Sequence, residues 1–437
     1  MRKHLIGILL GGVLLLVLAS CTQYDMSLLW WAQHNNEPSH SHSYEFVGYD
    51  VSGKTLYTVY GCSGCDEETK TPISSAVFVS TAEEAKMAVV PAGGYVVVTP
   101  ESAIEVLDMI PDGVTVIFQS GTYNKEIVFR QSVERSNVRL IGDMDEKHPL
   151  YGTIDADTYI AYVKEHPKEP VSNYSIYAYR RINDVMLYAV DGAVFKGGVS
   201  IDNSNSWNNI KEIENQNKTS YTSIVYISDL SICNFEFKES NLEINIDNAN
   251  TSDYGIHGLT LSNCNFIGSD TMRDNINSAN FAINAGSMKT LGCLEDVVVE
   301  NCTFEKYSKG MNTGTMRNLT VRECTFNDMG WSSIGVQGKN NTGDFVYTGN
   351  TFNGFNECAI GRARFDNAKV TISNNTFSGS NPSDGNTEKI LVWLGNGGTE
   401  PLSNVSITLS NNTYEGRSVS DTGIANATQD MFKVYAP

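Results

Sequence analysis

Two histidines and two cysteines near the N-terminus are of the types that bind metal ions. They are His40 and His42, in the stretch HSHS, and Cys62 and Cys65, in GCSGC. Two imidazoles and two thiolates form the ligand set of many tetrahedral structural zinc sites. A disulfide between Cys62 and Cys65, or a pair of free thiols, is equally consistent with this spacing. Zinc and disulfide remain alternatives, and each gives the residues a structural role.

A β-hairpin would bring these four side chains together. Residues 44–49 and 56–60 are short β-like segments, and the sequence VSGK at 51–54 is typical of a turn. The histidines precede the first segment and the cysteines follow the second, so all four are expected near the open end of the hairpin. The stretch resembles small His-x-His…Cys-x-x-Cys modules of exported bacterial proteins.

A second group of candidate residues lies in the segment GRARFDNAK, residues 361–369. In an extended strand, Arg362, Arg364 and Asp366 would project to one side. Lys309 would belong to the same strip in an earlier repeat. The formal net charge is −19, so a basic strip is unusual in this chain. Such a strip could bind the carboxylates of a uronate-containing glycan. A surface ladder of salt bridges is the structural alternative.

Cleavage of a glycan would place specific demands on these residues. A polysaccharide lyase needs a cation such as Ca²⁺ to neutralise the uronate, and a Lys, Arg or His base to remove the α-proton. Glycosidases use paired carboxylates at set separations. The chain has no adjacent Asp-Asp pair and no Gly-His-Gly, although GIHG at 255–258 comes close. The best catalytic candidates are therefore Arg362, Arg364, Asp366 and Lys309.

The elements that would carry these residues form a repeat. Its unit is apolar-x-apolar-x-(Asn/Gly/Glu)-x-x-Phe, with Tyr replacing Phe once. It occurs as YAVDGAVF (188–195), LSICNFEF (230–237), LTLSNCNF (259–266), VVVENCTF (297–304), LTVRECTF (319–326), FVYTGNTF (345–352), VTISNNTF (370–377) and ITLSNNTY (407–414). Short spacings between units fit one bare coil of a parallel β-helix, and longer spacings fit coils with inserted loops.

Stacked coils about 4.8 Å apart would place like residues on like. Leu259 and Leu261 and their counterparts in later repeats are expected to point inward. A bend should follow, because Asn and Gly there suit left-handed turn geometry. An aromatic stack is then expected from Phe266, Phe304, Phe326, Phe352 and Phe377.

Three cysteines occupy one column of this repeat, namely Cys264, Cys302 and Cys324. Later repeats have asparagine in that column, at 350, 375 and 412. Cysteine and asparagine rarely replace each other as catalysts or metal ligands, so the column predicts packing and not chemistry. We expect its cysteines to be buried free thiols.

The order of elements before the repeat also indicates a fold. TPESAIEVLDMIPDG (99–113) predicts an amphipathic helix, and strand-like segments follow it. This order resembles the entrance of the pectin-lyase-like right-handed β-helix family, in which such a helix covers the N-terminal end. The residues that carry the resemblance are Ala103-Ile104, Gly113, Val114, Val116, Gly121-Thr122-Tyr123, Glu126-Ile127 and Leu140-Ile141-Gly142. The aspartate segments and Gly-Arg-Pro-Trp stretch of the pectin methylesterases have no counterpart, so the resemblance implies the fold and not esterase activity.

Residues 1–21 have the features of an export signal. Arg2 and Lys3 precede an apolar run at 5–18, and Leu18-Ala19-Ser20-Cys21 resembles a bacterial lipobox. The resemblance implies lipidation of Cys21 and an extracytoplasmic, membrane-anchored protein of the bacterial cell envelope. An ordinary secretory signal is the alternative. Residues 22–75 would then form a tether and the small hairpin module.

The sequence as a whole predicts an all-β fold, with a right-handed single-stranded parallel β-helix over residues 76–437. The acidic charge argues against nucleic acid as a partner. Trp331 and Trp393 are candidates for stacking on sugar rings. We expect a monomeric surface lipoprotein that binds carbohydrate or acts in adhesion. A polysaccharide lyase acting on an acidic glycan and a purely structural envelope component are the alternatives.

Overall fold

The computed structural model describes residues 42–103, 110–129, 138–141, 165–166, 175–202, 221–245, 255–286, 294–338, 341–379, 390–395, 402, 404–419 and 432–436. Three predicted features lie outside these residues. They are the export signal with Cys21, the tether with His40, and residues 104–109 of the capping helix.

The chain divides into two compact units. The first comprises Met1–Gly48 and Val59–Lys70, and the second comprises Tyr49–Thr58 and Thr71–Pro437. A small sheet has the strand order β1 (Tyr44–Ser52), β2 (Thr55–Cys62) and β3 (Glu68–Ile73). A turn at Gly53, with φ of 60°, joins β1 to β2 and confirms the predicted hairpin.

The largest sheet, sheet B, belongs to the second unit and has 13 strands in the described part of the chain. Its main path runs through β4 (Val77–Val79), β5 (Tyr95–Val98), β6 (Thr115–Phe118), β11 (Met186–Ala189), β14 (Tyr221–Cys233), β17 (Gly255–Ser262), β20 (Leu294–Glu300), β23 (Arg317–Arg322), β26 (Asn341–Thr348), β29 (Phe365–Ser373) and β32 (Ser406–Ser410). Neighbours on this path pair in parallel, as β17 and β20 do. Off the path, β10 (Ser175–Asn183) pairs in parallel with β14 and antiparallel with β9 (Val138–Ile141).

Two further sheets in this unit are built from shorter strands. Sheet C contains β7 (Gly121–Tyr123), β12 (Ala193–Phe195), β15 (Glu236–Lys238), β18 (Asn265–Ile267), β21 (Thr303–Glu305), β24 (Thr325–Met329), β27 (Thr351–Phe355), β30 (Thr376–Ser378), β33 (Thr413–Tyr414) and β34 (Arg417–Ser418). Sheet D contains β8 (Ile127–Phe129), β13 (Val199–Asp202), β16 (Leu242–Asn245), β19 (Phe281–Ala285), β22 (Lys309–Thr313), β25 (Ser332–Val336), β28 (Cys358–Ala363), β31 (Ile390–Leu394) and β35 (Phe432–Tyr435). Only the last strand of each, β34 and β35, pairs antiparallel within these described strands.

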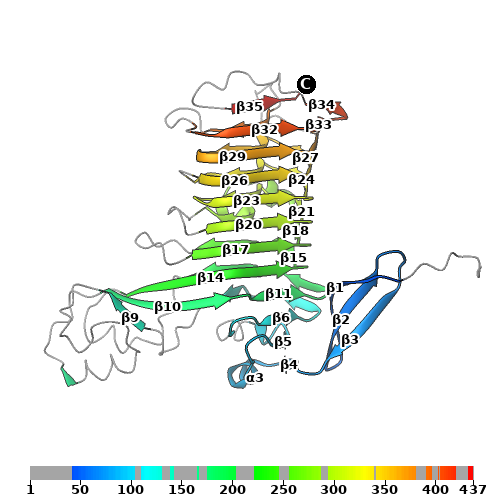
Figure 1. Cartoon of the computed structure of the whole chain (residues 1–437), viewed down its shortest axis with the longest axis vertical. Helices are drawn as coiled ribbons and strands as arrows, with labels where there is room; N and C mark the ends of the chain where they lie inside the picture. Colours follow the sequence, from blue (N-terminus) through cyan, green and yellow to red (C-terminus); the bar gives the residue numbers. More distant parts are fainter. Residues whose placement is uncertain are drawn as a thin grey trace, which may run out of the picture. The chain divides into compact units, whose positions relative to one another are not determined.

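Successive passes of the chain add one strand to each sheet in turn. Strands β17, β18 and β19 enter sheets B, C and D, and β20, β21 and β22 pair in parallel beside them. Figure 1 shows the sheet B strands β14, β17, β20, β23, β26, β29 and β32 stacked in chain order. The protein is therefore all-β with long parallel sheets, an arrangement compatible with the predicted β-helix.

The apolar columns of the repeat form the core. Leu259 and Leu261 are at most 1 % exposed, and they are in register with Val297 and Val299. The aromatic stack is confirmed over the five predicted phenylalanines, whose neighbouring ring centroids are 4.6 to 5.1 Å apart. Tyr123, Phe195 and Phe237 extend the aromatic column toward the N-terminus.

The bends between sheets B and C have the predicted left-handed residues. Asn263, Asn301 and Asn374 have φ of 54°, 52° and 57°. This conformation costs asparagine less than most residues, because its short polar side chain can hydrogen-bond locally. Asparagines of the repeat therefore mark several of these turns, and Glu323 and Gly349 take the same place in two other passes.

The column after this bend is buried, as expected. Cys264, Cys302 and Cys324 are each 1 % exposed and none forms a disulfide. Hydrogen bonds between the stacked thiols, together with burial, raise the pKa of Cys302 and Cys324. These thiols are held neutral, which agrees with a packing role.

Helices are short in the described residues. Helix α3 (Ala82–Met87) begins at Thr81, whose hydroxyl accepts a hydrogen bond from the Glu84 amide at 3.2 Å. The predicted capping helix starts as expected, because the Ala103 amide donates to the Thr99 carbonyl at 3.0 Å. Helix α7 (Asp270–Asp274) and the 3-10 turn η3 (Ser278–Asn280) lie between β18 and β19.

Candidate functional site

The first candidate site is the group formed by His42, Cys62 and Cys65. One ligand atom from each lies within 4.8 Å of the other two. The distance from Cys65 Sγ to His42 Nδ1 is 3.6 Å. Tetrahedral zinc with Zn–S of about 2.3 Å and Zn–N of about 2.0–2.1 Å would separate these ligand atoms by about 3.6 Å. The three side chains are therefore spaced as ligands of one metal ion.

Backbone hydrogen bonds position this group. The Cys62 amide donates to the Glu67 carbonyl at 2.8 Å and closes the turn that contains both cysteines. The Ser63 amide donates to the Ser43 carbonyl at 2.9 Å and fixes the residue next to His42. The ligands come from the two open ends of the hairpin, as the sequence predicts.

Two details of this site go beyond the sequence prediction. No disulfide joins Cys62 to Cys65 in the described structure. The fourth predicted ligand, His40, lies outside the described residues, but Glu67 Oε2 is 3.1 Å from His42 Nδ1. Burial, the charge of Glu67 and a hydrogen bond to its carboxylate raise the pKa of Tyr44, whose ring stacks on that of His42.

The second candidate, the basic segment, does not form one extended strand. Strand β28 ends at Ala363 and β29 begins at Phe365, so Arg364 lies at the corner between sheets D and B. Arg362 falls where the register of β28 shifts against β31. Asp366 is at the start of β29 and accepts a hydrogen bond from its neighbour Asn367 at 3.0 Å. The expectation of one extended strand through Arg362, Arg364 and Asp366 is therefore wrong, because the strand is interrupted at Arg364.

Lys309 is buried in sheet D and is not part of a surface strip. It is 1 % exposed, and its Nζ lies 4.8 Å from the Phe281 ring centroid and 4.4 Å from that of Trp331. The same atom donates to Asn312 Oδ1 at 2.9 Å. Asn312 in turn donates to Asn284 at 3.1 Å. The ammonium is surrounded by protein groups, and this geometry indicates a structural role for Lys309.

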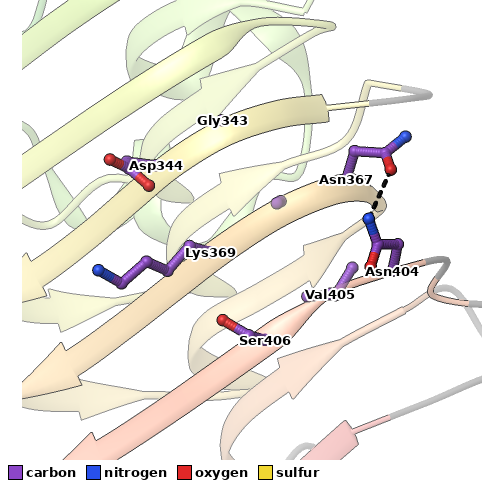
Figure 2. A pocket seen from close by; sticks show the side chains of 8 residues that line it. Gly343, Asp344, Asn367, Lys369, Asn404, Val405 and Ser406 are labelled. Carbon is purple, nitrogen blue, oxygen red and sulfur yellow. Dashed lines mark hydrogen bonds between the residues drawn. The ribbon is translucent and has the colours of Figure 1, made fainter.

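A shallow pocket on sheet B is lined by the last three residues of the basic segment, Asn367, Ala368 and Lys369. The pocket has a volume of about 420 Å³ and spans β26, β29 and β32. Asp344, Lys369 and Ser406 are in register on these three strands, and all three are exposed. Figure 2 shows the Lys369 and Asp344 side chains projecting from neighbouring strands.

Two asparagines complete the rim of this pocket. Asn367 and Asn404 both have φ of 50°, and Asn404 Nδ2 donates to Asn367 Oδ1 at 2.8 Å. Sequence reasoning missed them because they precede the repeat unit. Their signal would have been their common spacing, because each lies three residues before the first residue of a repeat unit, at 370 and 407.

The histidine of GIHG has charged neighbours that are distant in sequence. His257 Nδ1 is 3.1 Å from Glu295 Oε2, and Arg317 pairs with the same carboxylate. The three residues are in register on β17, β20 and β23. Glu295 is 5 % exposed, so this group stabilises a buried carboxylate on sheet B.

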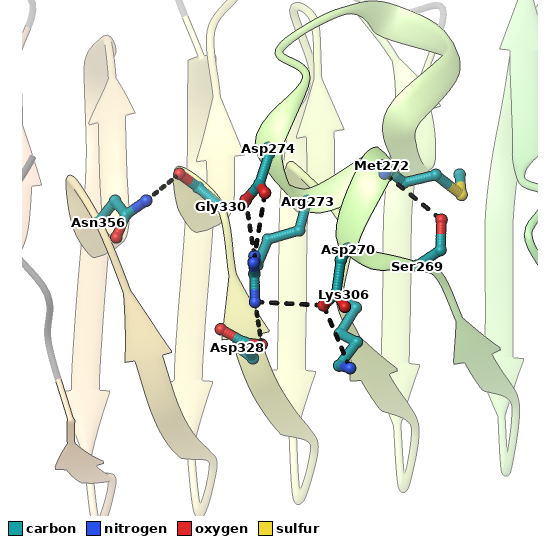
Figure 3. Close-up of polar contacts among 9 residues, drawn as sticks. All are labelled: Ser269, Asp270, Met272, Arg273, Asp274, Lys306, Asp328, Gly330 and Asn356. Carbon is teal, nitrogen blue, oxygen red and sulfur yellow. Dashed lines mark hydrogen bonds and ion pairs between the residues drawn. The ribbon is translucent and has the colours of Figure 1, made fainter.

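A cluster of acidic residues at α7 is neutralised by two basic side chains, Arg273 and Lys306. Arg273 lies 2.6 Å from Asp328, 2.8 Å from Asp274 and 3.4 Å from Asp270. Lys306 lies 3.2 Å from Asp270 (Figure 3). Hydrogen bonding to Arg273 lowers the pKa of Asp274. The guanidinium occupies the space among the carboxylates, so this cluster is not a metal site.

No protein-family model matches the chain. No curated protein matches its sequence. Among the described residues, none of the helices has the length and apolar character needed to span a bilayer.

Proposed function

We propose that this protein is a lipid-anchored component of the bacterial cell envelope that binds carbohydrate at the pocket on sheet B. Its three parallel sheets would form a right-handed single-stranded β-helix. The observation that carries the binding proposal is the in-register set Asp344, Lys369 and Ser406, with Asn367 and Asn404 beside it. Carboxylate, ammonium, amide and hydroxyl groups together match the donors and acceptors of a sugar ring.

The chemistry of the pocket favours an acidic glycan. Lys369 and Asp344 are both exposed. A uronate carboxylate would pair with Lys369, and sugar hydroxyls would bond to Asp344 and the asparagines. The pocket volume is within the range of small-molecule sites. Its open shape suits a polymer that lies along the sheet.

Binding to a panel of acidic and neutral glycans tests this proposal. Wild-type protein should bind an acidic glycan, and the affinity should fall with added salt. Lys369→Ala and Asn404→Ala should each weaken binding about tenfold or more, which corresponds to about 1.4 kcal/mol. Lys238→Ala, at an exposed lysine of β15, is the matched control and should bind normally. Absence of binding, or normal binding by both pocket variants, would reject the proposal.

The polysaccharide-lyase alternative has less support. Its candidate base Lys309 is 1 % exposed. Arg364 lies at a corner between two strands and does not share a strand with the other candidates. A lyase would release ultraviolet-absorbing unsaturated products from an acidic polysaccharide. Such products, if lost in Arg364→Ala, would favour the enzyme over the binding protein.

The envelope location rests on the sequence of residues 1–21. Cys21→Ala should abolish incorporation of labelled fatty acid and release the protein from the membrane fraction. Incorporation that persists in this variant would argue against lipidation at Cys21.

We also propose that His42, Cys62 and Cys65 bind a structural zinc ion. The 3.6 Å separation of Cys65 Sγ and His42 Nδ1 supports this reading over a disulfide. Purified reduced protein should bind one equivalent of Zn²⁺, and Cys62→Ser should lose it. A Cys62–Cys65 disulfide in protein isolated from the envelope, with no zinc bound after reduction, would reject it.

A further inference from the structure

We infer that Glu67 supplies the fourth ligand of the metal site, so that the ligand set is His42, Cys62, Cys65 and Glu67. This inference rests on the proposed zinc site and replaces the expected ligand His40. The starting observation is that Glu67 Oε2 lies 3.1 Å from His42 Nδ1. Nitrogen and oxygen ligands of one tetrahedral zinc ion lie about 3.4 Å apart.

The turn that holds the cysteines also holds Glu67. The Cys62 amide bonds to the Glu67 carbonyl at 2.8 Å, so the backbones of these two ligands are tied together. Glu67 is not one of the three residues whose ligand atoms all lie within 4.8 Å. Its side chain is 55 % exposed and pairs with His42, so a small rotation would be needed to bring its carboxylate to an ion bound by His42 and the two thiolates.

Tyr44 lies next to two of the proposed ligands. Its ring stacks on the His42 ring at a centroid distance of 5.8 Å. Burial and the neighbouring Glu67 carboxylate raise the pKa of its hydroxyl. Groups outside the ligand set commonly orient metal ligands, so we expect Tyr44 to help position His42 and Glu67.

The surrounding structure gives this ion a function in folding. Tyr44 and Phe46 of β1 are 38 % and 49 % exposed, and β3 has no buried residue. Residues 42–48 and 59–70 therefore have little core of their own. Small modules with so little buried surface commonly depend on a metal ion for stability. The ion would link residue 42 to residues 62–67 and close the hairpin.

Cobalt binding to the reduced full-length protein tests the inference. Co²⁺ should give the intense visible bands of a tetrahedral thiolate site in wild type. Glu67→Gln should lower the affinity at least about tenfold and change the spectrum. Glu68→Gln, at the exposed neighbouring carboxylate, and His40→Ala should both leave affinity and spectrum unchanged.

The outcomes separate this inference from the zinc proposal. If wild type binds no metal, the zinc proposal and the inference both fail. If wild type binds and Glu67→Gln is unaffected, the zinc proposal stands and the Glu67 assignment is overturned. Loss of binding in His40→Ala with normal Glu67→Gln gives the fourth position to His40. Protection of Cys62 and Cys65 from a thiol reagent by Zn²⁺, followed peptide by peptide, gives an independent readout.

Discussion

The ammonium of Lys309 lies over the indole of Trp331, with Nζ 4.4 Å from the ring centroid. From this position a chain of hydrogen bonds crosses three strands of sheet D. Asn312 accepts from Lys309 and donates to Asn284, which donates to both oxygens of Glu243 at 3.0 and 2.9 Å. A buried cation is thereby connected to a carboxylate through two amides.

Replacement of Lys309 should destabilise the protein. Lys309→Ala removes the bond to Asn312 and leaves space between two aromatic rings, so we expect a loss of about 2–4 kcal/mol in the free energy of unfolding. Lys309→Met fills the space and should lose less. Denaturant unfolding measures both, with Lys238→Ala expected within about 0.5 kcal/mol of wild type. A stable Lys309→Ala variant would show that the network contributes little.

Asn375 should be the most sensitive residue of the asparagine column. Its Oδ1 accepts from the amide and the Nδ2 of Asn350 at 2.9 and 3.1 Å. Its Nδ2 donates to the Tyr347 carbonyl and to Asn412. Asn375→Ala leaves these buried groups without hydrogen-bond partners and should lower the free energy of unfolding by about 2–4 kcal/mol. Asn375→Cys should cost less in the same assay, because Cys302 bonds to backbone carbonyls in an equivalent position.

Stability should fall as the solution becomes alkaline. Burial and contacts between thiols raise the folded-state pKa of Cys302 and Cys324, whereas unfolded cysteine titrates near about 8.5. The unfolded chain therefore releases protons first, and the stability present below pH about 8.5 is lost as the pH rises above it. Unfolding free energies measured from pH 7 to 10 should decrease. A flat profile in wild type, or an equal decrease in Cys302→Ala/Cys324→Ala, would contradict this assignment.

Two glycines that are neighbours in sheet D should respond differently to alanine. A Cβ at Gly361 would lie 2.1 Å from Cys358 Sγ, whereas at Gly335 the nearest atoms would be 3.5 Å away. Gly361→Ala should therefore cost about 1–3 kcal/mol, and Gly335→Ala should be close to neutral. Thermal unfolding distinguishes them. Adding Cys358→Ala should recover part of the loss in Gly361→Ala, and failure to do so would place the strain elsewhere.

The repeat predicted the parts of the fold that depend on local pattern. The aromatic stack, the inward leucines and the buried cysteines follow from residue type and spacing alone, because stacking places equivalent residues in register. The hairpin and its His and Cys residues were likewise visible. These features all lie within single repeat units or short segments.

Features that depend on where the chain turns were harder to predict from the sequence. The alternation of Arg362, Arg364 and Asp366 suggested a strand, but nothing in these residue types marks the corner at Arg364. Lys309 looked like a surface charge because its aromatic neighbours Phe281 and Trp331 come from other passes of the chain. The pocket around Lys369 also depends on three strands separated by loops of different length.

The change from cysteine to asparagine along one column has a mechanical consequence. The Cys302 thiol makes weak hydrogen bonds to the Cys264 amide and to a backbone carbonyl. The side-chain amides of Asn350, Asn375 and Asn412 make stronger bonds to one another and to carbonyls of neighbouring passes. If force peels the chain from its N-terminal end, the passes would separate one after another. The resistance would then rise on reaching Asn350, and the passes that carry Asn375 and Asn412 would be the last to open.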